Sequence, residues 1–242
     1  MTRVAIVTGA SGGIGREVAE RLAKDGMTVL VHYSGNKVAA DEIVEGIVKA
    51  GGTASTFQAD VADETQISAL FDEVERLYGG VDVVVNTAGI MPLAPLVDLK
   101  LEDLDRVHRT NIRGTFVVSQ QAARRVREGG AIINFSTSVT KIAVPGYTAY
   151  AASKGAVDGM TLILAKEMRG RNVTVNAVAP GPTATPLYFT GKPQSVIDAA
   201  TKAAPLERLG QPEDVAEVVS FLAGPARWIN GQVIYTNGGV VA

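Results

Sequence analysis

Short runs of apolar and β-branched residues alternate along the chain with longer stretches in which apolar residues recur at helical spacing. The runs predict strands at residues 3–8, 28–32, 53–58, 82–86, 130–136, 173–178 and 232–235. The stretches between them predict helices near residues 14–25, 37–50, 64–78, 101–127, 149–169 and 212–223. The strands barely alternate in polarity, which is typical when helices cover both faces of a sheet. We therefore expect one α/β domain over residues 1–242, with a doubly wound parallel sheet of about seven strands.

One segment fits neither pattern. Residues 180–194, "PGPTATPLYFTGKPQ", are rich in proline, glycine and threonine. Loops of this length in compact domains are usually disordered or form lids over a site. We therefore treat the segment as a candidate lid.

The composition limits the kinds of function. The 242 residues are 46% hydrophobic, enough for a substantial core, and the net charge of −2 gives no attraction to nucleic acid or to an anionic membrane. There is no cysteine, and neither His32 nor His108 has a second ligand at metal-binding spacing, so we expect neither disulfides nor a metal site. No apolar run has the length of a signal peptide or a membrane span, which predicts a soluble, cytoplasmic protein. Any acid–base chemistry then needs a residue other than histidine.

A glycine-rich turn joins the first strand to the first helix. In "VTGASGGIGREV" the glycines have the spacing T-G-x-x-x-G-x-G. Glycine lets the backbone turn tightly and approach a pyrophosphate, and the N–H groups that open the helix face the phosphates with a favourable dipole. Because the turn lies between a strand and a helix, we prefer a Rossmann-type dinucleotide site to a glycine-rich turn without function. The candidate cofactor-binding residues of the turn are Gly9, Ser11, Gly13, Ile14 and Gly15.

The end of the second strand indicates which dinucleotide binds. NAD sites usually place Asp or Glu there for the adenosine 2′-hydroxyl, whereas this chain has Tyr33 and Ser34. Without a carboxylate to repel a 2′-phosphate, Ser34, Asn36 and Lys37 are candidates to bind it by hydroxyl, amide and charge. Ser34 or Asn36 is also a candidate N-cap of the next helix, and both roles are compatible. The sequence thus favours NADP(H) over NAD, with Tyr33, Ser34, Asn36 and Lys37 near the phosphate.

Two further strand ends lie at the same edge of the predicted sheet. After the third strand, in "ADVAD", Asp60 is placed to accept a hydrogen bond from the adenine amino group and Val61 to pack on the ring. The fourth strand ends in "NTAG". Cofactors of doubly wound sheets lie across the carboxyl ends of the strands. The candidate cofactor-binding residues therefore also include Asp60, Val61, Asn86, Ala88 and Gly89.

A tyrosine and a lysine four residues apart are the candidate reacting groups. Tyr150 and Lys154, in "YAASK", share one face of a predicted helix. A phenol has a pKa near 10, and lowering that pKa by about three units takes roughly 4 kcal/mol. We expect the Lys154 ammonium and a bound, positively charged nicotinamide to supply it in a partly desolvated cleft. Taken alone, the pair is also compatible with a packed tyrosine and a surface lysine.

Hydroxyl and amide side chains accompany the pair. The fifth strand ends in Ser136, Thr137 and Ser138, where a hydroxyl can hold a substrate carbonyl oxygen beside the phenol. Asn111 lies inside a predicted helix, although asparagine is a poor helix former. Its amide is a candidate to fix a water that relays protons from Lys154, or else a buried group that bonds to the backbone.

Together these motifs resemble the short-chain dehydrogenase/reductase family over nearly the whole chain. The pieces that carry the resemblance are "TGASGGIG", "DV" at 60–61, "NTAG", Asn111, the serine cluster, "YAASK", "NAVAPGPTAT" and "GQVIYTNGG". Within the family the sequence is most similar to 3-oxoacyl-carrier-protein reductase-like and hydroxynaphthalene-reductase-like members.

The resemblance implies a role for each site residue. Tyr150 would be the acid/base, Lys154 would lower its pKa and bind the nicotinamide ribose, a serine would position the carbonyl, and Asn111 would hold the relay water. It also implies that residues 182–200 cover the substrate, and that the nicotinamide end meets Pro180, Gly181, Thr183 and Thr185.

The chain departs from the family pattern at three places. Thr87 replaces an asparagine in "NTAG", Gly12 stands where NADP-dependent members often carry a basic residue, and the usual serine position is Thr137. We prefer Ser138 as the positioning hydroxyl, with Thr137 as the rival.

These residues predict an NADP(H)-dependent carbonyl reductase or alcohol dehydrogenase acting on a largely uncharged or aromatic ketone, with 3-oxoacyl and polyketide-like ketones among the candidates. A catalytically idle NADP-binding sensor or scaffold is the alternative, and an epimerase or dehydratase on the same fold is a third possibility. We also expect a homo-oligomer, most simply a tetramer, because the predicted helices 101–127 and 149–169 carry more apolar positions than one sheet face needs.

Overall fold

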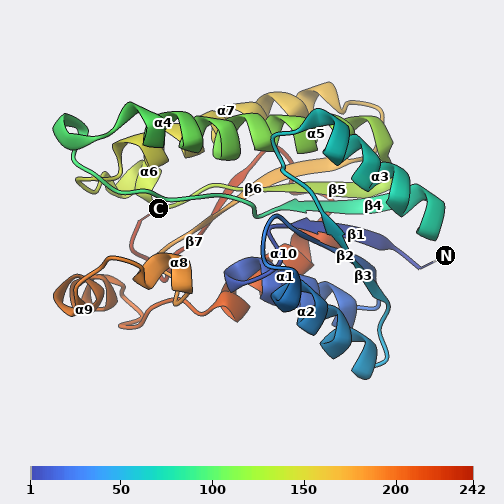
Figure 1. Ribbon diagram of the computed structural model, residues 1–242, viewed down its shortest axis with the longest axis horizontal. Coiled ribbons are helices and arrows are strands. Elements are labelled where there is room, and N and C mark those ends of the chain that lie inside the picture. Colours follow the sequence, from blue (N-terminus) through green and yellow to red (C-terminus); the bar gives the residue numbers. More distant parts are fainter. Residues whose placement is uncertain (1, 242) are drawn as a thin grey trace.

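The structure of the protein, a computed structural model, describes residues 2–241. Seven parallel strands form one sheet in the order β3-β2-β1-β4-β5-β6-β7 (Figure 1). The strands are β1 (Val4–Thr8), β2 (Thr28–Tyr33), β3 (Ala54–Gln58), β4 (Val81–Asn86), β5 (Val126–Phe135), β6 (Thr174–Pro180) and β7 (Val233–Thr236). The order reverses at β1, so the carboxyl ends of β1 and β4 flank the crevice in which such sheets bind ligands. The doubly wound sheet expected from the sequence is confirmed.

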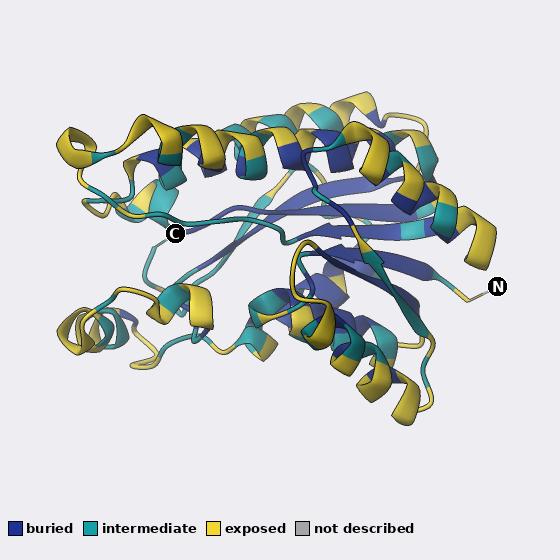
Figure 2. Cartoon of the chain, in the orientation of Figure 1, coloured by how far each residue is buried: buried dark blue, intermediate teal, exposed yellow. Residues whose placement is uncertain are grey.

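Helices cover both faces of the sheet. In Figure 1, α1 (Gly13–Lys24), α2 (Lys37–Lys49) and α10 (Pro212–Ala223) lie below it, and α3 (Glu64–Tyr78), α4 (Leu101–Val107), α5 (Gly114–Arg125) and α7 (Thr148–Glu167) lie above it. Each face has its own hydrophobic core, one built around Leu22 and Ile43 and the other around Phe71 and Leu70. Strands β1, β2 and β6 are buried along their whole length, whereas the edge strands β3 and β7 are only partly buried (Figure 2). The low polarity of the strand sequences thus reflects burial from two sides.

The predicted helix at 101–127 differs from the observed one in two ways. Between α4 and α5 lies a π-helical turn, His108–Arg113, and α5 ends at Arg125. β5 begins directly at Val126, which is buried and pairs with Val81 of β4 ahead of an irregularity in the register. The strand therefore begins earlier than the predicted range 130–136. The pattern missed this start because residues 126–129 lack the apolar run that marks the rest of the strand.

The candidate lid and the residues that directly follow it contain two helices. They are α8 (Pro186–Phe189) and α9 (Gln194–Ala203), which project from the carboxyl end of the sheet (Figure 1). The remaining short elements are a 3-10 turn at Leu96–Asp98 and α6 (Val139–Ile142). Across residues 2–241, no helix has the length and hydrophobicity that a membrane crossing requires.

Candidate active site

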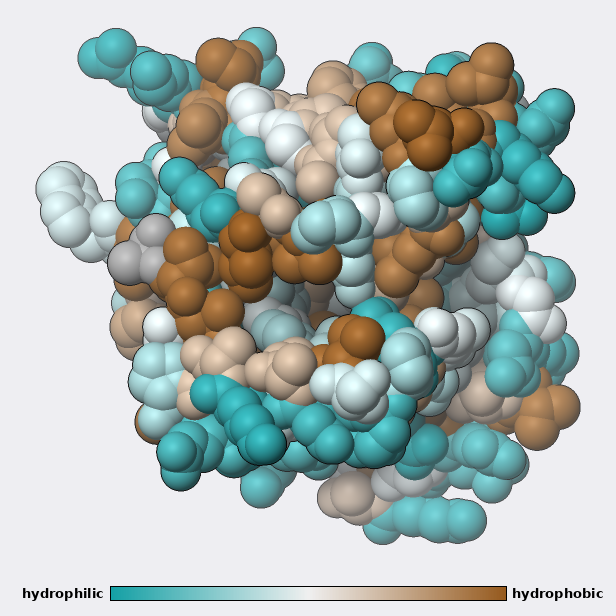
Figure 3. Space-filling view, turned by 90° about the vertical axis from the view of Figure 1, so that its left-hand side faces the viewer, coloured by the Kyte–Doolittle hydropathy of each residue, from teal (hydrophilic) through white to brown (hydrophobic). Residues whose placement is uncertain are grey.

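A cavity of about 1070 Å³ opens at the carboxyl ends of the strands. Figure 3 views this end of the molecule, where hydrophobic side chains gather around a central hollow. Its walls come from the segments that follow β1, β2, β3, β4, β5 and β6, and from α8 and α9. One continuous cavity thus joins the glycine-rich turn to the Tyr150–Lys154 pair and the lid.

The glycine-rich turn lines one end of the cavity and packs too closely for side chains. Gly9 has a φ of +64°, and a Cβ there would lie 2.8 Å from Cα of Ala88. A Cβ on Gly15 would lie 2.5 Å from the carbonyl oxygen of Gly9. The first N–H groups of α1 have no partner within the helix and open onto the cavity at Gly13 and Ile14. This surface fits the pyrophosphate of a dinucleotide, and Ser11 lines it as well.

The end of β2 places only half of its predicted residues at the cavity. Ser34 and Asn36 line it, and Asn36 is the N-cap of α2, where its side chain accepts a hydrogen bond from the Ala39 N–H at 3.1 Å. Tyr33 is 5% exposed and belongs to the hydrophobic core instead. Lys37 does not line the cavity either, because its ammonium forms an exposed ion pair with Asp41 at 2.6 Å. Of the four residues predicted near the phosphate, the cavity lining therefore contains only Ser34 and Asn36.

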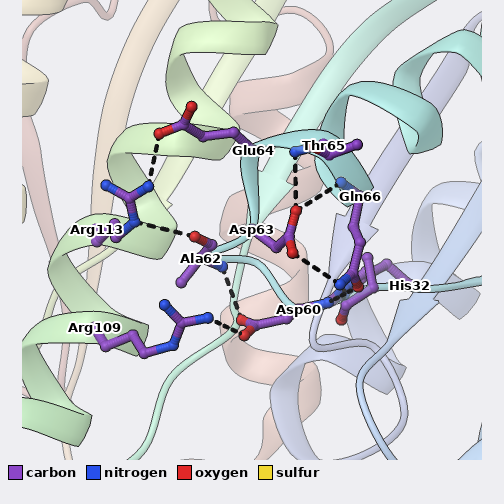
Figure 4. Close-up of polar contacts among 10 residues, drawn as sticks. His32, Asp60, Ala62, Asp63, Glu64, Thr65, Gln66, Arg109 and Arg113 are labelled. Atoms are coloured by element: carbon purple, nitrogen blue, oxygen red, sulfur yellow. Dashed lines mark hydrogen bonds and ion pairs between the residues drawn. The ribbon is translucent and has the colours of Figure 1, made fainter.

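The loop after β3 is held against the π-helical turn (Figure 4). Asp60 accepts hydrogen bonds from the Ala62 N–H at 2.9 Å and from Arg109 at 2.6 Å. Arg113 donates to the carbonyl oxygen of Ala62 and to Glu64. Asp60 and Val61 both line the cavity, and the Asp60 carboxylate, with its side chain 43% exposed, keeps acceptor capacity for an adenine amino group.

The "NTAG" segment divides between support and lining. Ala88 and Gly89 line the cavity. Asn86 does not: it is buried at the end of β4, where its side-chain oxygen accepts a hydrogen bond from the Thr8 hydroxyl at 2.7 Å. In this structure Asn86 braces β4 against β1 instead of facing a ligand. Thr87, the departure from the family pattern, donates to the Thr8 carbonyl oxygen and so joins the same two strands.

Tyr150 and Lys154 both line the cavity, where Lys154 is buried and Tyr150 is partly exposed. The Lys154 ammonium donates to the carbonyl oxygen of Phe135 at 2.8 Å and lies 5.8 Å from the centre of the Tyr150 ring. Burial lowers the pKa of Lys154 from 10.5 to about 8, against the opposing charge of Asp158. Burial also raises the pKa of Tyr150 from 10 to about 12, and the nearby Thr137 hydroxyl only partly opposes this. In the protein without a cofactor, desolvation thus outweighs the favourable contacts of the phenol, and the lowering of its pKa expected from Lys154 together with a bound nicotinamide stays a prediction.

The three hydroxyls after β5 are buried and line the cavity, but they differ in their bonds. Thr137 is the one close enough to the Tyr150 phenol to influence its pKa. The Ser138 hydroxyl donates a long hydrogen bond of 3.2 Å to the carbonyl oxygen of Ala179. The Ser136 hydroxyl influences the pKa of Asp158 on α7. Thr137 and Ser138 are thus both within the site, with different surroundings.

Asn111 lies on the π-helical turn and is fully buried. Its side chain exchanges two hydrogen bonds of 2.9 Å with the backbone of Ile90 and donates a third to Ser153 at 3.1 Å. Its amide oxygen also approaches Gly89, next to the Lys154 ammonium: a Cβ on Gly89 would lie 3.3 Å from that oxygen and 3.6 Å from Nζ. The asparagine that looked out of place in a helix therefore ties the "NTAG" loop to α7.

The start of the lid contributes to the cavity wall, where Pro180, Gly181, Thr183 and Thr185 all line it. The Thr185 hydroxyl caps α8 by accepting from the Tyr188 N–H at 3.2 Å. Gly13 of the glycine-rich turn faces Thr185, to whose side chain an added Cβ would come within 3.6 Å. The lid thus meets the turn directly.

His32 is a residue of the site that sequence reasoning missed. Its buried ring accepts a hydrogen bond from the Gly9 N–H on Nδ1 at 3.0 Å and donates from Nε2 to the carbonyl oxygen of Ala59 at 3.0 Å. Burial lowers its pKa from 6.5 to about 4, so the ring is neutral near pH 7. His32 joins the glycine-rich turn to the loop that carries Asp60. The available signal in the sequence was the position of His32 at the end of a predicted strand, at the edge of the sheet where the cofactor is expected.

The comparisons with known proteins agree with this architecture. Residues 9–241 match the family described as "Enoyl-(Acyl carrier protein) reductase". A "Short-chain type dehydrogenase/reductase" of Picea abies is 46% identical over 250 residues, covering 99% of this chain and 92% of that protein. An "NADPH-dependent aldehyde reductase-like protein, chloroplastic" of Arabidopsis thaliana is 40% identical over 254 residues, covering 99% of this chain and 94% of that protein.

A solved structure extends the likeness to three dimensions. A short-chain dehydrogenase from Burkholderia cenocepacia in complex with NADP superposes with a TM-score of 0.93 and 38% identity, covering 100% of this chain and 98% of the other. The chain is thus an oxidoreductase of the short-chain dehydrogenase/reductase family. Its relatives also include hydroxynaphthalene reductase-like proteins, as the motifs predict.

Proposed function

We propose that the protein is an NADP(H)-dependent carbonyl reductase that interconverts a ketone or aldehyde and the corresponding alcohol. The observation that carries the proposal is one continuous cavity with the glycine-rich turn at one end and Tyr150 beside Lys154 farther along it. The Burkholderia cenocepacia protein contains NADP, and the Arabidopsis thaliana relative is described as NADPH-dependent. The absence of a carboxylate at Ser34 supports the same cofactor, because an acid there would repel a 2′-phosphate.

The cofactor-binding residues of this proposal follow the cavity. The glycine-rich turn and the α1 N-terminus would hold the pyrophosphate, and Ser34 and Asn36 the 2′-phosphate. Asp60 and Val61 would hold the adenine, and Pro180, Gly181, Thr183 and Thr185 the nicotinamide end. NADPH bound there supplies the hydride. Lys154 would bind the nicotinamide ribose with the N–H donors that its bond to Phe135 leaves free.

Tyr150 donates the proton in the proposed reduction. Since burial raises its pKa to about 12, the phenol is protonated throughout the neutral range and is available as an acid. Ser138 holds the carbonyl oxygen beside the phenol, a role for which its long bond to Ala179 can be exchanged. Thr137 supports the phenol itself. Asn111 would keep the Lys154 side of the site in place, with or without a relay water.

Replacement of the phenol tests the proposal. Tyr150→Phe keeps the ring but removes the proton donor, so kcat should fall roughly 10²- to 10⁴-fold, while NADPH affinity and Tm stay close to wild type. Tyr147→Phe is the matched control, since this second tyrosine lines the same cavity with its ring 6.4 Å away and should keep its turnover. Ser138→Ala should lower kcat about 10²- to 10³-fold, and Thr137→Val should lower it less. The reverse order would make Thr137 the positioning hydroxyl.

Two results would remove the proposal. Near wild-type turnover of Tyr150→Phe on a good substrate would show that the phenol is not the acid. A wild-type protein that binds NADPH, seen by fluorescence of the bound nicotinamide, but reduces no aldehyde or ketone would be the idle binding module.

We also propose that the chain forms a homotetramer. Large apolar side chains remain exposed on the outer surfaces of α5 and α7, among them Phe116 (50% exposed), Leu162 (44%) and Ile163 (57%). Neighbouring exposed apolar side chains on packed helices are typical of a protein interface. A tetramer of two-fold symmetry would cover them.

A further inference from the structure

One charged side chain lies in the part of the cavity beyond Tyr150. Lys192 follows α8 in the lid and lines the cavity together with apolar residues of α9. The other charged lining residues are Asp60 and Arg109, which pair with each other, and Lys154, which is held at the end of β5. A cation in an otherwise apolar wall costs desolvation, so its presence needs a reason.

The Lys192 ammonium is fixed in place by neutral groups. It donates to the carbonyl oxygen of Tyr188 at 2.6 Å and lies 4.2 Å from the centre of the Tyr188 ring and 5.8 Å from that of Tyr147. Both aromatic contacts are within the range of a cation–π interaction. Among the described residues no carboxylate forms an ion pair with it, and burial lowers its pKa without an opposing charge. At least one N–H donor is therefore left for a ligand.

The position relates this ammonium to the reacting groups. The Tyr147 ring lies 5.8 Å from Lys192 Nζ and 6.4 Å from the Tyr150 ring. These two separations set an upper limit of about 12 Å between the ammonium and the centre of the Tyr150 ring. A molecule with a single aromatic ring or a short chain can reach both ends. The same cavity is also lined by Val144, Leu187 and Val196, which suit an apolar body.

We infer that Lys192 is a specificity residue that binds a carboxylate on the substrate, so that the preferred substrates are aldehydes or ketones with an apolar body and a carboxylate at the far end. This inference rests on the proposed carbonyl reductase function and names its substrate class. The carboxylate would supply the counter-charge that the cavity wall lacks, in a charge-assisted hydrogen bond. A phosphate of the cofactor is the competing partner, and the experiment includes it.

Matched ligands test the inference without requiring turnover. The affinity of 4-(hydroxymethyl)benzoate for the NADPH-loaded protein, a pair that cannot react, is compared by calorimetry with that of the neutral 4-(hydroxymethyl)benzamide. In parallel, kcat/KM is measured for 4-formylbenzoate and 4-formylbenzamide. Lys192→Met should weaken the two carboxylates roughly 10- to 100-fold, the range of one charge-assisted hydrogen bond, and leave the two amides within about twofold. Lys192→Arg should retain most of the carboxylate preference.

Lys202→Met is the control, because Lys202 lies on α9 but does not line the cavity, and its removal changes the net charge equally. Equal losses in Lys192→Met and Lys202→Met would mean long-range attraction and would overturn the inference. So would equal carboxylate and amide affinities in the wild type, or a Lys192→Met variant whose main defect is NADPH affinity. Carboxylate-selective binding that depends on Lys192, without reduction of either aldehyde, would support this binding site and contradict the proposed function alone.

Discussion

His32 makes stability depend on pH in a way that can be calculated. In the folded protein its pKa is about 4, compared with 6.5 for an unburied histidine, because burial disfavours the charged ring. Between these two values the unfolded chain binds more protons than the folded one, so stability rises with pH across this window and is lost as the pH falls through it. At about 1.36 kcal/mol per pH unit, acidification from pH 7.5 to 5.0 should remove about 2 kcal/mol through this residue alone.

A pair of histidine variants isolates this contribution. His32→Gln cannot titrate, so the wild type should lose about 2 kcal/mol more of its unfolding free energy than the variant between pH 7.5 and 5.0. Urea unfolding followed by circular dichroism gives the four free energies, and their double difference cancels the other titrating groups. Trp228 is fully exposed and would be a poor fluorescence probe.

His108→Gln is the matched control, because His108 is exposed on the π-helical turn. Between pH 7.5 and 5.0, the unfolding free energy of His108→Gln should change by nearly the same amount as that of the wild type. If the wild type and His32→Gln lose stability in parallel, to within about 0.5 kcal/mol, the ring is not buried as a neutral base and its bonds to Gly9 and Ala59 do not hold in solution.

Two further predictions concern the cofactor and the assembly. Ser34→Asp should lower kcat/KM with NADPH relative to NADH by about tenfold or more, about 1.4 kcal/mol, because it brings a carboxylate to the proposed phosphate site; wild-type preference for NADH would contradict the NADP(H) assignment. Tyr33→Asp is not an equivalent test, since Tyr33 lies in the core and its replacement would destabilise the fold. Light scattering at micromolar concentration should give a mass near four times 25.3 kDa, and Phe116→Glu should reduce it; a wild-type mass of 25.3 kDa would remove the tetramer.

The sequence predicted the sheet well because its strands are buried on both faces. A strand such as Val4–Thr8 is apolar along its whole length because helices cover both of its faces. Runs of apolar and β-branched residues therefore identified all seven strands. The π-helical turn around Asn111 had only one signal, a poor helix former in a helical stretch, and the pattern could not distinguish a changed helix type from a functional side chain. The short helices α8 and α9 contain no buried residue, and the apolar stripe of α9 (Val196, Ala199, Ala200 and Ala203) faces the cavity instead of the core.

The candidate site was predictable where backbone geometry decides and less so where side chains compete. Gly9 and Gly15 could be assigned because a Cβ at either position would clash. Tyr33 was assigned to the cofactor by its distance from the strand end, whereas a large aromatic side chain gains more by entering the core. The sequence alone gives no signal for Lys192, since a lysine in a lid loop resembles a solvated charge until its two tyrosine neighbours are known.

The pKa values of Tyr150 and Lys154 shift in opposite directions for the same reason, and the shift of Tyr150 affects which direction of the reaction the protein favours. Burial disfavours the charged forms of both side chains. Without cofactor, the phenol of Tyr150 therefore keeps its proton, and Lys154 loses its proton more readily than a free lysine does. A neutral phenol beside the carbonyl oxygen is ready to act as an acid, and this is what reduction needs at neutral pH. Alcohol oxidation needs the phenolate instead, and the desolvation that raises the pKa of Tyr150 to about 12 makes the phenolate costly in the protein on its own. The chain's own electrostatics therefore favour carbonyl reduction, and oxidation depends on the additional positive charge of an oxidised nicotinamide beside the phenol.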